Sequence, residues 1–383
     1  MMTGVFFKEQ AMIYADYFPK DNVGISHWGQ NDERLLLWSK DRLKIFRKTY
    51  DRKKISAEVQ SLADNCTEYF SPAFTWSRKF HRGNMRNIAR ANLLNLRKFE
   101  KQYGKADLIL AHVGFPAGVV AMEISKKKEI PYLIAEHMTP FPFPDYRYRR
   151  KKLIPPLWQA YLEANGIVAV SENLRDEMSF YGINNVTVLP NFINDKDFVP
   201  APKKDSLGSL KMLSIGRLER QKGLDVLLRA LSGLRDLPFQ LEVIGDGSER
   251  GSLMTLAEEL GLNERINWRG NLDKTEIIQS LQSANLFVLA SRHESFGIVF
   301  LEALACGIPC VGSYCGGPEE IVDESVGFIV APEDEKELAK AIRYILVNPE
   351  KYPKEKIRAY FEKQFATEKI VKKLRSLYLK ASS

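Results

Sequence analysis

The chain has 383 residues, about twice the length of a typical domain, which favours two domains with separate cores. Its 45% hydrophobic and 27% charged residues are normal for a soluble globular protein and exclude general disorder. Four cysteines are too few for a disulfide framework, and neither a signal peptide nor a membrane span is visible. We therefore expect a cytoplasmic protein.

The formal net charge of +8 lies entirely in the first half of the chain. Residues 1–200 carry 30 basic and 22 acidic side chains, whereas the remainder carries 26 of each. Between Lys40 and Lys105, 17 basic side chains stand against 6 acidic ones. Such a run is a solvated helical face, or a surface for an anionic membrane, a polyanionic substrate or nucleic acid. Composition alone leaves these alternatives open.

The chain begins in an unusual way for an α/β protein. A doubly wound lobe opens with a strand, a glycine turn and a helix. Here Gly4 comes at once, and Phe6–Tyr17 already has the pattern of the helix. We therefore expect that the first strand of the lobe is missing from this sequence.

Apolar runs of four to six residues then alternate with amphipathic stretches, which predicts βαβ units and parallel sheets with helices on both faces. The predicted strands of the first half are Leu108–Ala111, Tyr132–Ala135, Ile167–Val170 and Val186–Leu189. Those of the second half are Met212–Ile215, Gln240–Ile244, Arg265–Trp268, Leu286–Ala290, Cys310–Gly312 and Gly327–Val330. Helices are predicted at Gly223–Leu234, Glu249–Leu260, Lys274–Ser283, Val299–Ala305 and Glu335–Leu346.

Turn-forming residues collect between Asn191 and Ser209, where the periodicity lapses. We place the first lobe at residues 1–195, the second at 206–355 and a helical tail at 356–383. Open α/β sheets bind ligands outside the carboxyl ends of their strands, so the cleft between the lobes is the expected site.

The most specific segment runs from Ser291 to Pro309, after a predicted buried strand. Glu294 lies in a loop, and Gly297 opens a helix whose free N–H groups suit a phosphate or a sugar oxygen. Glu302 lies inside that helix, on the order of 10–12 Å from Glu294, which is roughly the reach of a nucleotide sugar. Two glutamates at this spacing are weak evidence alone, but their placement across a glycine-opened helix favours a binding role.

A second candidate site is the turn after the strand at Met212–Ile215. Arg217 and Lys222 flank this turn before the helix from Gly223, so both can point at one anion. Breaking a sugar–phosphate bond leaves a diphosphate with growing negative charge, and fixed cations lower that barrier. Two cations can replace a metal, so no metal is expected.

These motifs together resemble the retaining nucleotide-sugar glycosyltransferases of family 4, which have the GT-B fold. The resemblance rests on Glu294 and Glu302 with seven residues between them, and on Cys315-Gly316-Gly317-Pro318-Glu319-Glu320-Ile321-Val322 after them. It also rests on Ser214–Asp225, Gly245-Asp246-Gly247 and Trp268-Arg269-Gly270. The implied architecture is α/β, with two doubly wound Rossmann-like lobes, an interlobe cleft and a last helix that crosses back onto the first lobe.

The resemblance also implies roles for individual residues. Glu294 would bind hydroxyls of the donor sugar, and Glu302 the ribose. The diphosphate would lie on the turn of Gly216, Arg217 and Lys222 and on the backbone of Phe296, Gly297, Ile298 and Val299, and the base near Gly245, Trp268 and Arg269. His137 matches the position that contacts the transferred sugar near the reacting centre. His112 also has a match, but a packing role suits it equally.

Retaining transfer could proceed by double displacement or by attack from the face of the departing phosphate. The resemblance supplies no carboxylate nucleophile, which favours metal-independent front-face transfer. No cofactor is expected besides a UDP-, GDP- or ADP-sugar as donor substrate. The implied acceptor is a glycan or a lipid-linked glycan of bacterial surface-polysaccharide synthesis.

The segment Phe141–Lys152 mixes aromatic and basic residues shortly after His137. It could hold an anionic lipid-linked acceptor or lie at an anionic membrane surface, and it could equally be a solvated loop. The former reading predicts a peripheral position at the inner face of the cell membrane.

Two other functions stay open at this point. A nucleotide-sugar epimerase of the same fold would bind the nucleotide similarly but need no acceptor, and transfer assays separate the two. A nucleic-acid-binding protein would use the basic first half, although no reader motif is present and no nucleic acid is expected. The spacing of Cys306, Cys310 and Cys315 lacks paired ligands, so we interpret them as small buried residues.

Overall fold

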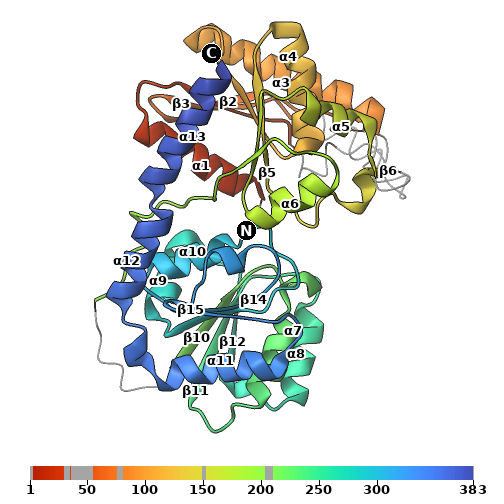
Figure 1. Cartoon of the computed structure of the whole chain (residues 1–383). Helices are drawn as coiled ribbons and strands as arrows, with labels where there is room; N and C mark the ends of the chain where they lie inside the picture. The colour runs from red at the N-terminus through yellow and green to blue at the C-terminus, as the bar shows by residue number, and fades with distance from the viewer. Residues whose placement is uncertain are drawn as a thin grey trace.

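The computed structural model describes residues 3–29, 35, 55–75, 81–148, 152–202 and 210–382. Much of the basic run between Lys40 and Lys105, the end of the predicted linker and residues 149–151 lie outside these ranges. Figure 1 shows two α/β lobes, with the N-terminus lying between them and the last two helices running along one side. None of the described helices combines the length and apolar character needed to span a bilayer.

The first lobe contains two sheets. A parallel sheet has the order β4-β5-β8-β9, and a smaller sheet has the order β1-β3-β2. The strands are β1 (Val23–His27), β2 (Glu58–Ala63), β3 (Cys66–Phe70), β4 (Ile109–His112), β5 (Tyr132–Glu136), β8 (Gly166–Ala169) and β9 (Val186–Val188), with a short hairpin of β6 (Arg147–Tyr148) and β7 (Lys152–Leu153). The helices are α1 (Thr3–Tyr17), α3 (His81–Tyr103), α4 (Val119–Lys128), α5 (Pro155–Leu162) and α6 (Glu172–Phe180).

The second lobe is one six-stranded parallel sheet of order β12-β11-β10-β13-β14-β15. Its strands are β10 (Leu210–Ile215), β11 (Phe239–Ile244), β12 (Ile266–Gly270), β13 (Leu286–Leu289), β14 (Cys310–Ser313) and β15 (Gly327–Val330). Its helices are α7 (Leu224–Ser232), α8 (Arg250–Glu259), α9 (Lys274–Ser283), α10 (Ile298–Ala305) and α11 (Glu335–Val347). Every predicted strand and helix of this lobe is confirmed, with shifts of only one or two residues at most ends.

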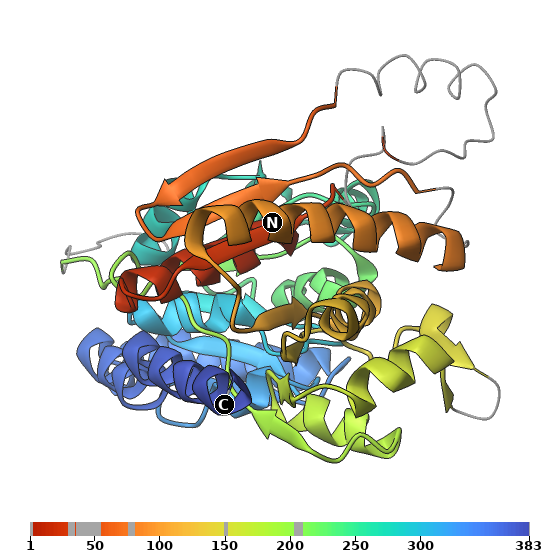
Figure 2. The ribbon, with the colours of Figure 1, turned by 90° about the horizontal axis from the view of Figure 1, so that it is seen from above.

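The small sheet of the first lobe departs from the predicted pattern. We expected parallel sheets, yet β2 pairs antiparallel with β3. Most of β2 is exposed, so its sequence Glu-Val-Gln-Ser-Leu-Ala lacks the apolar run by which the other strands were recognised. The helix predicted at Phe6–Tyr17 is present as α1, and Figure 2 shows the small sheet and α3 (orange) at the outer end of this lobe.

The tail forms two helices, α12 (Lys354–Phe365) and α13 (Thr367–Ser382), with a break at Ala366. Buried residues of α13 pack on the first lobe, where Val371 joins a cluster with Ile13 and Tyr14 of α1. Arg375 adds an ion pair with Asp21 at 2.8 Å. The tail therefore links the two lobes (Figure 1).

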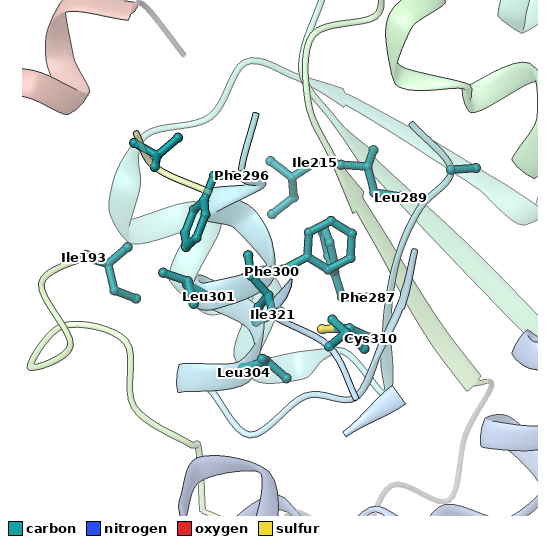
Figure 3. Close-up of a cluster of buried hydrophobic side chains, with 14 of the residues drawn as sticks. Ile193, Ile215, Phe287, Leu289, Phe296, Phe300, Leu301, Leu304, Cys310 and Ile321 are labelled. Carbon is teal, nitrogen blue, oxygen red and sulfur yellow. The ribbon is translucent and has the colours of Figure 1, made fainter. Parts of the chain in front are cut away.

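The core of the second lobe surrounds α10, as Figure 3 shows. Phe300 of α10 meets Phe287 of β13 edge to face, with ring centroids 5.1 Å apart. Cys306 and Cys310 are buried in the same core, as predicted. Because α10 is apolar on nearly all sides, its one carboxylate, Glu302, is also buried, with 4% of its surface exposed.

Candidate active site

The ends of three neighbouring strands of the second lobe meet closely. The Gly216 amide donates to Ile244 O at 3.0 Å, and the Gly245 amide donates to Gly270 O at 2.7 Å. A Cβ on Gly245 would lie 1.9 Å from Gly216 O, and Gly245 has a φ of +129°. Glycine is therefore required for this approach. Gly216 and Gly245, two of the residues predicted to bind the sugar nucleotide, are thus brought into contact.

Lys222 and Glu294 form the central ion pair of the second lobe. The Lys222 ammonium donates to the Glu294 carboxylate, and Ser291 Oγ donates to the same carboxylate oxygen at 2.8 Å. The Lys222 side chain is 19% exposed and that of Glu294 is 9% exposed. Partial burial strengthens such a pair because water screens it less.

Gly223 explains why these two residues meet. A Cβ at this position would lie 1.8 Å from Ala290 O, directly after β13, and the φ of Gly223 is +60°. The turn before α7 can therefore lie directly against the loop that follows β13. Lys222 comes from the turn and Glu294 from the loop.

Arg292 braces the same junction and was missed as a site residue. Its guanidinium binds Asp225 through two hydrogen bonds of 2.9 Å, and it also pairs with Glu333 and with Arg220 O. These carboxylates raise the pKa of Arg292. The position of Arg292, two residues before Glu294, was the available signal in the sequence, since its partners come from distant positions.

The N-terminus of α10 faces the loop Cys315-Gly316-Gly317-Pro318, which we call the glycine-rich motif. Gly297 caps this helix with a φ of +92°, as the sequence predicted. Gly317 packs on the Phe296 backbone, where a Cβ would lie 2.4 Å from Phe296 Cα. Glu319 accepts from the Gly316 amide at 2.8 Å. The free N–H groups of this first turn can hold an anion beside Lys222.

Glu302 is a buried carboxyl group without a full set of partners. Its Oε2 makes no hydrogen bond among the described residues. Burial raises the pKa of Glu302 to about 8. The negative charge of Glu9 in α1 adds to this rise, whereas the positive charge of Lys274 opposes it. An unsatisfied buried carboxyl group is costly and is typical of a site that pairs with a ligand hydroxyl.

The two histidines of the first lobe also meet. His112 Nδ1 lies 3.2 Å from His137 Nε2, and the Phe7 ring of α1 stacks on His112 with centroids 4.3 Å apart. Burial lowers the pKa of His112 to about 4. Burial and the neighbouring His112 hold the pKa of His137 well below its usual range. Both rings are therefore neutral near pH 7.

Glu136 holds the loop that carries His137, and it was not predicted as a site residue. Its carboxylate accepts from the amides of Gly114 at 2.9 Å and of His137 and Met138 at 3.0 Å, and from Tyr161 Oη at 2.5 Å. Burial raises the pKa of Glu136, and these hydrogen bonds oppose that shift. Glu136 thus fixes the two loops that present His112 and His137.

The lobes touch at the N-terminus of α6. Glu320 of the second lobe accepts from the amides of Glu172 at 2.9 Å and Asn173 at 3.0 Å. A Cβ on Gly316 would lie 2.7 Å from Asn173 Nδ2. The glycine-rich motif therefore lies directly against the first lobe.

Other predicted residues form no hydrogen bond with Lys222 or Glu294 in the described part of the chain. Arg217 is exposed and has no side-chain partner in the described part of the chain. Arg269 pairs with Glu242 at 3.4 Å, and Trp268 is half-buried. No hydrogen bond joins His137 to Glu294. Within the described ranges, no three His, Cys, Asp or Glu side chains are placed to hold a metal ion.

The comparisons with known proteins fit this geometry. A family model for Glycosyltransferase Family 4 matches residues 55–197, and a model for Glycosyl transferases group 1 matches residues 195–363. The chain is 32% identical to glycogen synthase of Mycobacterium tuberculosis over 49% of its own length and 47% of that protein. It is 30% identical to lipopolysaccharide 1,6-galactosyltransferase of Escherichia coli over 44% of its length and 48% of that protein. These matches span about half the length of each relative.

A solved structure extends the likeness to nearly the whole chain. HepE of Anabaena, in complex with UDP and glucose, superposes with a TM-score of 0.68 at 19% identity, over 96% of this chain and 95% of that one. Two Rossmann-like lobes in this arrangement define the GT-B fold, as predicted. The chain belongs to glycosyltransferase family 4.

Proposed function

We propose that the protein transfers a sugar from a nucleoside-diphosphate donor to an acceptor hydroxyl, with retention of the anomeric configuration. The observation that carries this proposal is the Lys222–Glu294 pair beside the N-terminus of α10. A cation and free amides suit the diphosphate, and the adjacent carboxylate suits sugar hydroxyls. The UDP and glucose named in the HepE complex support the same ligand class.

In the proposed reaction, the bond between the anomeric carbon and the diphosphate oxygen breaks, and a bond from that carbon to the acceptor oxygen forms. The acceptor enters from the face of the leaving group, and its proton passes to a phosphate oxygen. Lys222, Arg217 and the amides of Gly297 to Val299 stabilise the charge that develops on the diphosphate. No step in this scheme uses a metal.

The remaining residues position the sugar nucleotide. Glu302 would accept hydrogen bonds from the ribose, while Gly245, Trp268 and Arg269 would lie along the base. His137 would contact the transferred sugar, since its neutral ring has a buried Nδ1 that makes no hydrogen bond of ordinary geometry in the described ranges. The Asn191 side chain also interacts with this ring. Phe7 covers this ring, so the sugar would have to displace Phe7 or approach past it.

The proposed function also includes the chemical class of the acceptor. The name of the lipopolysaccharide galactosyltransferase supports a glycan or lipid-linked glycan of surface-polysaccharide synthesis as the acceptor. We propose in addition that the transfer takes place at the inner face of the cell membrane. In the segment Phe141–Lys152, Phe141 is buried, with a centroid 5.9 Å from that of Tyr161, which anchors the segment beside Glu136.

Hydrolysis without acceptor tests the reaction and its stereochemistry. UDP-glucose, UDP-galactose and GDP-mannose would each be incubated with the protein, and the released sugar followed by proton NMR. The proposal predicts that one donor first releases the α-anomer. First release of the β-anomer would contradict retention, and an exchange of the sugar configuration on the intact nucleotide would indicate an epimerase.

A further inference from the structure

A hollow of about 290 Å³ lies between α3 and α4 of the first lobe. None of the residues proposed to bind the sugar nucleotide lines this hollow. It is lined by Arg86, Ala89, Arg90, Leu93, Glu123, Ile124 and Lys127, which together we name the α3–α4 surface. Figure 1 shows these two helices at the end of the first lobe that points away from the second lobe.

The rim of the α3–α4 surface carries unpaired cations. Arg86, Arg90 and Lys127 are exposed, and none has a hydrogen-bond or carboxylate partner among the residues that the structure describes. The neighbours of Lys127 behave differently, since Lys126 pairs with Glu163 at 2.7 Å and Lys128 with Glu100 at 2.8 Å. The lining contains three cations and one acidic residue, Glu123, so the rim keeps a net positive charge that can bind an anion.

The floor of the α3–α4 surface is apolar. Ala89 and Ile124 are buried, and Leu93 is half-buried beneath the cations. A free phosphate would leave this aliphatic floor in water, whereas a phosphate attached to a lipid would cover it. No aromatic side chain is in the lining, so nucleic-acid bases would find no stacking platform.

The cationic side of α3 continues beyond the hollow. Arg86, Arg90, Arg97 and Lys101 follow one another at spacings of four, seven and four residues, which places them on one side of the helix. Arg97 and Lys101 are also exposed. A row of cations along a helix suits an extended anionic surface better than a single ion.

We propose that the α3–α4 surface docks the protein on the phosphate headgroups of an anionic lipid bilayer. This inference rests on the lipid-linked acceptor in the proposed function and names the surface that would bring the protein to it. α4 follows directly after the loop Gly114–Gly118, which Glu136 ties to His137. The hollow lies on the order of 10 Å along α4 from that loop, which is the distance that a lipid-linked acceptor would have to extend from a docked bilayer toward the first-lobe histidines.

Vesicle co-sedimentation tests the docking surface without any sugar nucleotide, so its result is independent of sugar transfer. The full chain would be mixed with vesicles of 30% phosphatidylglycerol in phosphatidylcholine, and with vesicles of phosphatidylcholine alone. The test variant is Arg86→Ala/Arg90→Ala/Lys127→Ala. The matched control is Lys336→Ala/Lys356→Ala/Lys363→Ala, which removes three exposed cations whose side chains have no partner among the described residues.

Each cation near an anionic surface contributes about five-fold in binding, so the test variant should bind the anionic vesicles about a hundred-fold more weakly than the wild type. The control should lose less than about five-fold, and both variants should keep the wild-type melting temperature. Equal binding of the wild type to both kinds of vesicle would overturn the proposal. So would wild-type affinity in a folded test variant, or a preference for single-stranded RNA over anionic vesicles at the same salt concentration.

Discussion

Lys222 and Glu294, 72 positions apart in the sequence, are joined by an ion pair at the junction of the α7 turn and the loop after β13. A bound diphosphate would compete with Glu294 for the Lys222 ammonium. Glu294 would then be released toward the hydroxyls of the donor sugar. The pair thus keeps both charges compensated while the site is without donor.

Removal of Lys222 should affect the chemical step. Lys222→Ala is expected to lower kcat/KM for sugar transfer by about 10²–10³-fold, since one fixed group that stabilises the leaving diphosphate is lost. Steady-state kinetics measure this, with Lys211→Ala as a control because Lys211 is an exposed cation of the same lobe. Similar losses in both variants would show that the effect is not specific to the pair.

Replacement of Glu294 should weaken binding of the complete sugar nucleotide without weakening binding of the nucleotide alone. Glu294→Gln leaves Lys222 without its counter-charge, so calorimetry should find UDP bound at least as tightly as by the wild type. Binding and transfer of the complete donor should fall by at least about ten-fold, because the contact with the sugar hydroxyls is weakened. Weaker binding of UDP itself would argue against competition between diphosphate and carboxylate.

Glycine at position 223 should be essential for stability. In Gly223→Ala, the new Cβ would meet Ala290 O, and the positive φ would be strained. We expect a loss of more than about 2 kcal/mol in the free energy of unfolding. Gly251→Ala is the control, because a Cβ there meets nothing within 4 Å, and it should change the free energy of unfolding by less than about 0.5 kcal/mol. Chemical denaturation measures both, and equal stability of the two variants would refute the packing argument.

The buried Glu302 should make the protein less stable as the pH rises. Its folded pKa of about 8 lies above the unfolded value near 4.5, so the folded state binds more protons between these limits. Stability from this group is therefore lost as the pH rises from about 4.5 to 8. Glu302→Gln should flatten the melting profile in that window and raise the melting temperature at pH 8. The exposed Glu258→Gln should leave it unchanged, and no difference between the variants would contradict the burial argument.

The buried histidine pair should make the protein less stable as the pH falls, which is the opposite of the pH dependence expected for Glu302. The pKa of His112 is about 4 when folded and near 6.5 when unfolded, so the unfolded state binds more protons in this range. Stability should fall as the pH drops from about 6.5 to 4, by on the order of 2–3 kcal/mol for His112. His112→Gln should reduce this loss, whereas His293→Gln, at an exposed position, should retain it. Melting curves across this range would decide the matter.

The success of prediction from sequence followed the burial of each element. All four residues of β13 are buried, so the strand reads as a continuous apolar run and was found with its length almost correct. β2 is exposed along most of its length, so no such run marks it. The motif around Gly297 was recognisable because a strand, a glycine and a helix follow one another locally.

The contacts of the site were harder to predict than its motifs. Glu136 and Tyr161 come together only because α5 packs beside β5, and nothing in the sequence near either residue indicates that contact. The same holds for Arg292 and Glu333, which lie 41 positions apart. A single sequence indicates which residue types gather along the chain, but the tertiary fold decides which of them become partners.

A thermal-shift screen tests the central claim most directly. UDP-, GDP- and ADP-sugars would each be added to the wild type and to Lys222→Ala, since a ligand that binds the native state raises its melting temperature. The account predicts that sugars of one nucleotide stabilise the wild type and that Lys222→Ala loses most of this shift. A donor that stabilises both proteins equally, or the failure of every sugar nucleotide to stabilise the wild type, would contradict it.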